Sequence, residues 1–184
     1  MCSPRYASAM PTLVMDPPPV ELEALLERRR RLGLDHRDEM WEGVLHMNPA
    51  PHGRHHRIGQ QLAELLGPPA TTAGLLPAIG IFNLGVPEDY RVPDGAIHRP
   101  GPDQMYYETA ALVVEIVSPA DESWEKLPFY AAHDVDEILM IDPAAHSVDW
   151  LGLNDGEYRP IERSGLIDLG VSDLTEQIDW PPAE

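Results

Sequence analysis

Residues 110–117, AALVVEIV, restrict the fold most, because a single glutamate, Glu115, interrupts an otherwise apolar run. The run is too short to span a membrane, and its apolar residues do not alternate with polar ones. Such a strand is expected where both faces of a sheet are covered. Residues 136–142, DEILMID, predict a second buried strand. We therefore expect an α/β fold, with a mixed central sheet flanked by helices.

Further elements follow from hydrophobic periodicity and turn residues. A helix is predicted to begin near residue 55, and Gly67 with the two prolines after it is expected to end this helix. Its apolar residues are spaced so that they share one face with a histidine. These residues are His55, Ile58, Leu62 and Leu65. The other predicted helices are at 20–32, 123–133 and 173–178. The other predicted strands are at 39–47, either continuous or bent at Gly43, and at 77–86, 90–98, 146–153 and 157–162, the last two joined by a hairpin turn at residues 154–156.

The chain is expected to form one domain after a short leader. The first nineteen residues hold five prolines and no sustained apolar period, which predicts an extended or disordered segment. Residues 20–184 then form a single domain, because 184 residues with 43% hydrophobic content can bury one core of ordinary size. An N-terminal helix and a β-hairpin are expected as additions to the central sheet.

The formal net charge of −18 limits the possible partners. It argues against broad, non-specific adhesion to nucleic acid or anionic membranes. The one dense basic run, residues 28–31, is typical of a solvated helix face, and a role in binding nucleic acid is the less favoured alternative. Cys2 is the only cysteine, so an intramolecular disulfide is excluded. Because the sequence has no signal-like segment and no long apolar run, we expect a soluble cytoplasmic protein with no membrane partner.

Glu115 requires a cation, since an unpaired buried carboxylate costs several kcal/mol. A metal ion, an arginine or Lys126 could supply it, and a purely structural salt bridge is an alternative. Lys126 is the only lysine beside twelve arginines. An ammonium is a compact charge with an adjustable pKa, unlike a guanidinium, so chemistry can favour it. The simpler alternative is a surface pair with Glu122.

Asp94 lies in the segment RVPDGAIH, where Pro-Asp-Gly is also an ordinary turn signal. Asp94 and Glu115 are each expected on or beside a strand of the same sheet. Two such carboxylates can converge on a divalent cation that prefers oxygen ligands, and the carbonyl of Ile116 could add a third ligand.

Four stretches together resemble the PD-(D/E)xK nuclease superfamily, and more closely a bacterial family of putative restriction endonucleases formerly classed as a domain of unknown function. They are EMWEGVLHM followed by APHGRHHRIGQQL, then VPD, then ALVVEIVSPADESWEK, then LPFYAAHDVDEILMIDP. The resemblance implies a restriction-endonuclease-like core, usually in a homodimer. It also implies cleavage of DNA phosphodiesters with Mg²⁺, for which Mn²⁺ is a substitute.

The resemblance assigns roles to individual residues. Asp94 and Glu115 match the two motif acids, which would hold one or two Mg²⁺ ions with help from Ile116. The usual lysine position is Val117 here, and Lys126 matches the lysine that this family places on the next helix. Lys126 would orient the attacking water or offset developing charge.

Three further residues have weaker assignments. Glu42 matches the acidic residue of the first motif and would complete the metal shell, with Glu39 a weaker candidate. His55 matches the histidine that opens the next helix, where it would contact a phosphate or carry a proton, although a core-facing histidine is an equal alternative. Tyr130 would support Lys126 or simply pack.

Two other classes of function remain open. One is a binding or regulatory protein that keeps the nuclease fold without activity, which the acidic composition favours. The other is a zinc hydrolase that uses His52, His55 and His56, although the segment HGRHH has no distant partner at zinc-ligand spacing.

Overall fold

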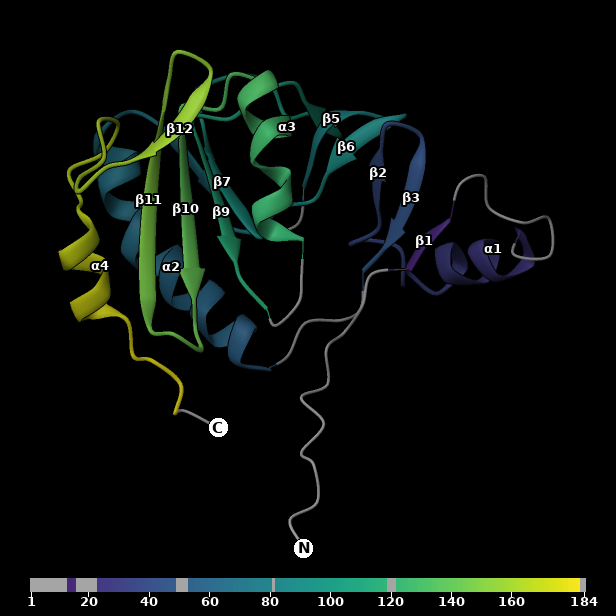
Figure 1. The fold of residues 1–184 in the computed structure, drawn as a ribbon, viewed down its shortest axis with the longest axis horizontal. Helices are drawn as coiled ribbons and strands as arrows, with labels where there is room; N and C mark the ends of the chain where they lie inside the picture. The colour runs from purple at the N-terminus through teal and green to yellow at the C-terminus, as the bar shows by residue number, and fades with distance from the viewer. Residues whose placement is uncertain (1–12, 16–22, 49–52, 81, 119–121, 183–184) are drawn as a thin grey trace, which may run out of the picture.

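The computed structural model describes residues 13–15, 23–48, 53–80, 82–118 and 122–182, which form two six-stranded mixed sheets and the helices around them (Figure 1). The core sheet has the order β12 (Glu157–Pro160), β11 (Ser147–Asn154), β10 (Glu137–Asp142), β9 (Leu112–Ile116), β7 (Gly95–His98) and β4 (Leu76–Ala78). The outer sheet has the order β1 (Leu13–Met15), β3 (Val44–Met47), β2 (Glu39–Trp41), β6 (Asp89–Arg91), β5 (Asn83–Val86) and β8 (Tyr106–Tyr107). The helices are α1 (Glu23–Arg31), α2 (Gly53–Thr72), the short 3₁₀ helix η2 (Ser123–Lys126), α3 (Leu127–Ala132) and α4 (Val171–Gln177).

Strand β9 is the buried strand that the apolar run predicted. It pairs in parallel with β10 and antiparallel with β7. Leu112, Val114 and Ile116 pack in the cluster that contains the buried face of α2, whereas Val113 packs with Phe129 of α3. The two helices cover opposite faces of the core sheet (Figure 1). Because side chains alternate along a strand, Glu115 shares the face of Val113 and is directed toward α3.

Helix α2 extends beyond the predicted stop at Gly67 and the two prolines. It continues to Thr72 because Ala70, fully buried, prolongs the apolar face by one more turn. The hydroxyl groups of Thr71 and Thr72 also donate hydrogen bonds to carbonyl groups one turn earlier. Core packing therefore outweighs the missing N–H donors of Pro68 and Pro69.

The predicted strand at 39–47 is a hairpin. Its two strands, β2 and β3, are joined by Glu42 and Gly43, which have φ values of 50° and 86°. Such values suit a tight two-residue hairpin turn. A third strand lies at this edge, because Leu13–Met15, which belong to the predicted extended or disordered leader, form β1 and pair with β3. The other residues of the predicted leader lie outside the described residues.

The predicted strands at 77–86 and 90–98 each divide between the two sheets, so the structure has a second sheet beside the expected central one. Pro93 lies at one division and lacks the N–H that a continuous ladder needs. Helix α1 forms where the sequence predicts a helix, but none of its residues is buried. Among the described residues, no helix is long and apolar enough for a membrane span.

Candidate active site

Asp94 lies beside the end of β9 because the backbone of β9 holds it there. Its N–H donates to the carbonyl of Val114 at 3.1 Å, and its Oδ2 accepts the N–H of Ile116 at 2.9 Å. Asp94 immediately precedes β7, and Glu115 is the penultimate residue of β9. The antiparallel pairing of these two strands thus brings together the two predicted metal ligands and Ile116.

Lys126 contacts two buried carboxylates. Its Nζ lies 3.1 Å from Glu115 Oε1 and 2.8 Å from Glu39 Oε1. The side chain of Lys126 is 9% exposed, and those of Glu115 and Glu39 are 3% and 1% exposed. The hydroxyl of Tyr130, one helical turn later, donates to the same oxygen of Glu115. Lys126 therefore reaches the acidic pair from the start of α3, and the alternative surface pair is not formed, since Glu122 contacts His46 at 2.9 Å.

Glu39, the weaker candidate in the sequence, is firmly held in this cluster. Its Oε1 accepts the N–H of Val92 at 2.9 Å as well as contacting Lys126, and its Oε2 accepts the indole N–H of Trp41 at 2.7 Å. Glu39 and Trp41 are two residues apart on β2 and therefore share a face. This alternation is the sequence signal that distinguishes Glu39.

Glu42 does not join the cluster. It is exposed in the β2–β3 turn with a φ of 50°, and its N–H donates to Asp89 Oδ1 at 3.0 Å. The turn places Glu42 at the tip of the hairpin, away from the face that carries Glu39. The structure thus favours Glu39 over Glu42 as the acid that the first motif contributes.

Asp94 has a shell of donors on both oxygens. His55 Nε2, in the first turn of α2, lies 2.9 Å from Oδ2, and Arg37 donates to Oδ1 at 2.9 Å. Burial alone would raise the pKa of Asp94, but the bonds from His55 and Ile116 and the charge of Arg37 lower it below its usual value. Asp94 is therefore ionised at neutral pH. Arg37 had no sequence signal, because no spacing connects it to Asp94.

Burial raises the pKa of Glu115, and the carboxylates of Asp94 and Glu39 add to this effect, whereas Lys126 and Tyr130 oppose it. Burial lowers the pKa of Lys126, but Glu115 and Glu39 outweigh burial and raise it above its ordinary value. Lys126 therefore remains an ammonium, and Glu115 binds a proton more readily than Asp94 does.

The donor chemistry of the cluster suits a hard cation. Asp94 and Glu115 offer carboxylate oxygens, which Mg²⁺ prefers. Within the described ranges, no group of three or more His, Cys, Asp and Glu side chains is arranged to hold a metal ion. Both oxygens of Asp94 accept protein donors, so a metal ion would have to replace contacts such as that of Arg37.

The predicted zinc ligands do not form a triad in the part of the chain that the structure describes. His55 is buried against Asp94, whereas His56 is exposed. His52 lies outside the described residues.

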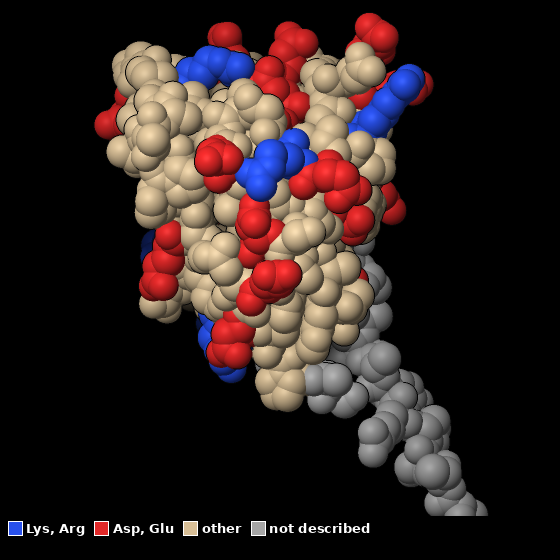
Figure 2. Space-filling model, turned by 90° about the vertical axis from the view of Figure 1, so that its left-hand side faces the viewer, with Lys and Arg blue, Asp and Glu red and all other residues tan. Residues whose placement is uncertain are grey.

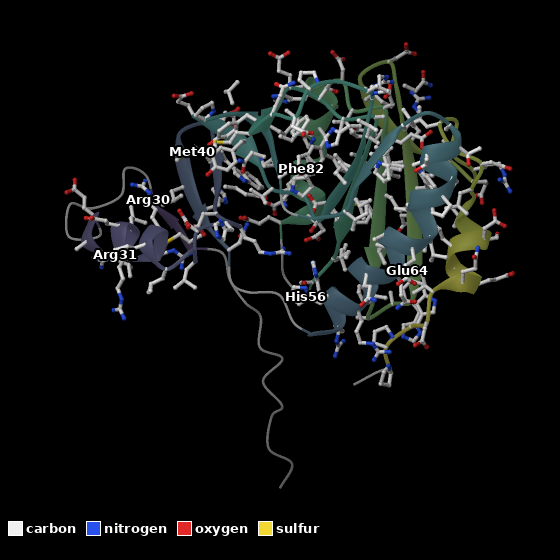
Figure 3. The ribbon with its side chains drawn as sticks, turned by 180° about the vertical axis from the view of Figure 1, so that it is seen from behind. Arg30, Arg31, Met40, His56, Glu64 and Phe82 are labelled. Atoms are coloured by element: carbon white, nitrogen blue, oxygen red, sulfur yellow. The ribbon has the colours of Figure 1, made fainter. Side chains whose placement is uncertain are left out.

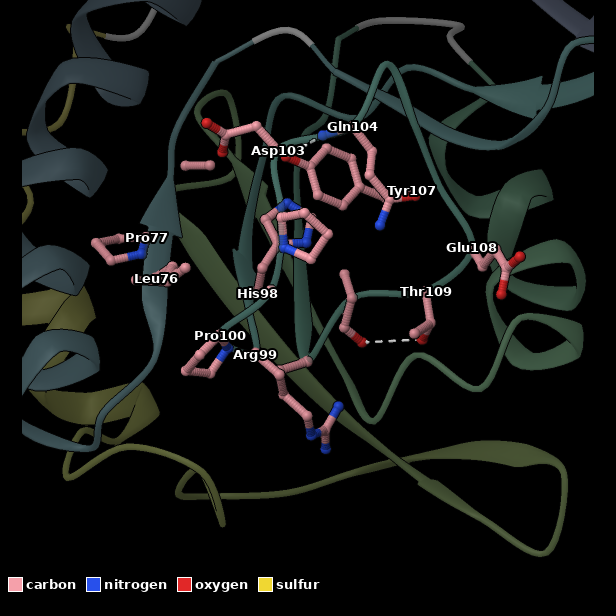
Figure 4. A pocket seen from close by; sticks show the side chains of 15 residues that line it. Leu76, Pro77, His98, Arg99, Pro100, Asp103, Gln104, Tyr107, Glu108 and Thr109 are labelled. Atoms are coloured by element: carbon pink, nitrogen blue, oxygen red, sulfur yellow. Dashed lines mark hydrogen bonds between the residues drawn. The ribbon is translucent and has the colours of Figure 1, made fainter.

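A separate pocket of about 460 Å³ lies near the opposite end of β7 (Figure 4). It includes His98, the last residue of β7, whose ring stacks on Tyr107 at 4.2 Å between centroids. None of the described residues that line it belongs to the acidic cluster around Lys126.

The candidate active site is the cluster of Asp94, Glu115, Glu39 and Lys126.

Comparison with known proteins agrees with the fold and the motifs. The model of the Uma2 family, described as "Putative restriction endonuclease", matches residues 21–179. A solved structure of a putative nuclease from Anabaena variabilis has 16% sequence identity and a TM-score of 0.61, over 76% of this chain and 90% of that chain. At this identity the similarity concerns the fold, and it confirms the predicted nuclease-like core. A comparison with curated proteins gave no match.

Proposed function

The chain belongs to the Uma2 family, and on that premise we propose that it is a Mg²⁺-dependent endonuclease that hydrolyses phosphodiester bonds of DNA. The observation that carries the proposal is the buried ammonium of Lys126, whose Nζ lies 2.8 Å from Glu39 and 3.1 Å from Glu115. A lysine kept charged among carboxylates matches a reaction in which negative charge develops on phosphate oxygens.

The expected Mg²⁺ would be held by Asp94, Glu115 and the carbonyl of Ile116. When bound, the ion would supply polarisation of the scissile phosphate and a lowered pKa of a bound water. Lys126 would offset negative charge on the phosphate or orient the water from its place at the start of α3. Glu39 and Tyr130 would act as positioning residues, because they fix Lys126 and Glu115 through direct contacts.

His55 and Arg37 bring two donors to Asp94. In the proposed reaction they would orient its carboxylate, and His55 could also contact a phosphate or carry a proton.

The test is the conversion of supercoiled plasmid to nicked and linear forms with Mg²⁺ or Mn²⁺. We expect the parent protein to nick DNA and EDTA to abolish the activity. Glu115→Gln should lower the rate at least about 100-fold, the effect of removing an electrostatic group from an active site. Lys126→Arg should keep metal binding but cleave far more slowly, since a guanidinium is wider and less adaptable as a point charge.

Thermal unfolding and Mn²⁺ titration of both variants are the controls for folding and metal binding. Absence of nicking by the folded parent at every protein concentration, with both metals, would contradict the proposal. Cleavage by Lys126→Arg at the parent rate would show that the lysine is dispensable.

The second candidate is a binding protein that keeps the nuclease fold without activity. The occupied oxygens of Asp94 and the net charge of −18 favour it. Mg²⁺ titration separates the two, because a silent binding protein would show no metal binding that depends on Glu115. A zinc hydrolase gains no support from the described histidines.

The homodimer and the cytoplasmic location also remain proposals. Both come from the family resemblance and the composition. Sedimentation analysis of the purified protein would test the dimer.

A further inference from the structure

The arginines of α1 differ from the other cations of this acidic protein. Among the described residues, cations within 4.0 Å of a carboxylate oxygen include Arg29, Arg37, Arg57, Arg91, Arg99, Arg159, Arg163 and Lys126. On the face that carries α4 and β12, basic side chains likewise lie among acidic ones (Figure 2). Within the described part of the chain, Arg28, Arg30 and Arg31 are the arginines whose side chains make no hydrogen bond or ion pair.

These three arginines are exposed and lie close together on one element. Arg28 and Arg31 are one helical turn apart and share a face, and Arg30 flanks them. Helix α1 buries none of its residues and lies at the side of the molecule away from α2 and α4, where Arg30 and Arg31 are labelled (Figure 3). In a chain with a net charge of −18, three guanidinium groups on one short helix without an ion pair among the described residues are a local exception.

Helix α1 is also tied to the candidate active site. Arg29 donates to Asp38 Oδ1 at 2.7 Å and Oδ2 at 3.2 Å, and Asp38 is the residue before Glu39 of the cluster. Arg37, in the same connection, donates to Asp94. The exposed arginines therefore lie on a helix that is anchored beside two carboxylates of the site, Glu39 and Asp94.

We propose that Arg28, Arg30 and Arg31 form a surface that binds backbone phosphates of DNA beside the scissile bond. The inference rests on the proposed function, because it assigns the contact with substrate that such a nuclease needs. A protein this acidic gains no long-range attraction for DNA, so affinity has to come from local cations. Guanidinium groups suit phosphate oxygens because they donate in a planar fork.

The alternative ligand for these three arginines is an acidic surface on a second copy of this chain. The link of α1 to Asp38 and Arg37 favours DNA, because it anchors the element that carries these arginines beside the carboxylates at which the proposed function cleaves DNA.

The experiment compares two variants with the same loss of charge. The first is Arg28→Gln with Arg30→Gln and Arg31→Gln. The matched control is Arg57→Gln with Arg99→Gln and Arg159→Gln, which removes exposed arginines that pair with carboxylates. Binding of each protein to a fluorescent DNA duplex is measured by anisotropy in EDTA over a range of salt concentrations.

We expect the α1 variant to bind about tenfold more weakly or worse at low salt, and the control to stay within about twofold of the parent. The slope of log affinity against log salt should become shallower by about 0.9 for each phosphate that the variant no longer neutralises, up to about 2.7 for three. Equal effects in the two variants, or no measurable affinity in the parent, would overturn the inference. So would a change in the mass of the α1 variant by sedimentation, which would identify a second copy as the occupant.

A small phosphodiester separates this inference from the proposed function. Bis(p-nitrophenyl) phosphate has a single phosphate and no flanking backbone phosphates for α1 to bind, so the α1 variant should hydrolyse it at the parent rate with Mn²⁺. If the parent hydrolyses it and both variants bind DNA alike, the inference fails and the function stands. If the parent hydrolyses neither substrate, but the α1 variant binds DNA more weakly than the parent does, the function fails and the inference stands.

Discussion

Glu115 shows at the scale of one residue how a single carboxylate organises a site. Its place in an apolar strand predicted a cation, and Lys126 supplies that cation from eleven residues later. Tyr130 and Glu39 complete the arrangement, because one donates to Glu115 and the other shares Lys126 with it. Removing any one of these partners leaves a buried polar group with an unmet requirement.

The pair Glu39 and Glu42 gives the clearest single-residue prediction. Glu39→Gln should lower the free energy of unfolding by about 3 kcal/mol, because a buried carboxylate that contacts Lys126 is lost. The matched variant Glu42→Gln should change it by no more than about 0.5 kcal/mol, since Glu42 is exposed in a turn. Urea denaturation measures both values. Equal destabilisation by the two variants would contradict the assignment of Glu39 to the cluster.

The helices α1 and α2 show at the scale of the element that one periodic pattern can have two outcomes. Hydrophobic periodicity in the sequence predicts both, and both form helices. Only α2 lies on the core sheet, where Ile58 and Leu62 are fully buried, whereas Leu25 of α1 is 43% exposed. Periodicity indicates which side of a helix is apolar, but the rest of the molecule decides whether that side is covered.

Substitutions on the two helices test this difference. Leu62→Ala should lower the free energy of unfolding by about 2–5 kcal/mol, because it removes packed atoms and leaves a cavity beneath β9. Leu25→Ala should cost less than about 1 kcal/mol, since much of this side chain is already in water. Thermal and urea unfolding of the two variants provide the comparison. A large loss in Leu25→Ala would indicate that α1 is covered in solution.

At the scale of the whole molecule, the two ends of β7 lie in two chemically different regions. Asp94, just before its first residue, belongs to the acidic cluster. His98, its last residue, is buried and has no hydrogen-bond partner on Nε2 among the described residues. Burial lowers the pKa of His98 below its ordinary value of 6.5, although a bond with the backbone of Thr109 opposes this shift.

His98 therefore makes stability depend on pH. The unfolded chain binds a proton near pH 6.5 and the folded protein only at lower pH, so its contribution is present above the unfolded pKa and is lost as the pH falls below about 6.5. We expect the difference in melting temperature between the parent and His98→Gln to move in favour of the variant from about pH 7.5 to about pH 5.5. Scanning fluorimetry of both proteins measures this, and taking their difference removes the effect of the shared net charge. A difference that does not vary with pH would show that His98 does not titrate in this range.

Much of the fold was predictable because it depends on local pattern. The buried strands β9 and β10 and the helix predicted at 123–133 follow from apolar runs and hydrophobic periodicity. The division into two sheets and the extension of α2 past Pro69 were not predictable. They depend on packing between segments distant in sequence, which outweighs local propensity.

The sequence alone determined the α/β class and singled out Glu115 and Lys126 as candidate site residues, because a charge in an apolar strand and a solitary lysine are local signals. Asp94 became a candidate only beside Glu115 and through the family resemblance. Tertiary structure decided which acid meets Lys126 and what surrounds Asp94. Glu39 is selected over Glu42 by the direction of a strand and its turn, and Arg37 and His55 reach Asp94 across 57 and 39 residues of chain. Such contacts are set by how the sheets and α2 come together, so the spacing of residues in the sequence cannot specify them.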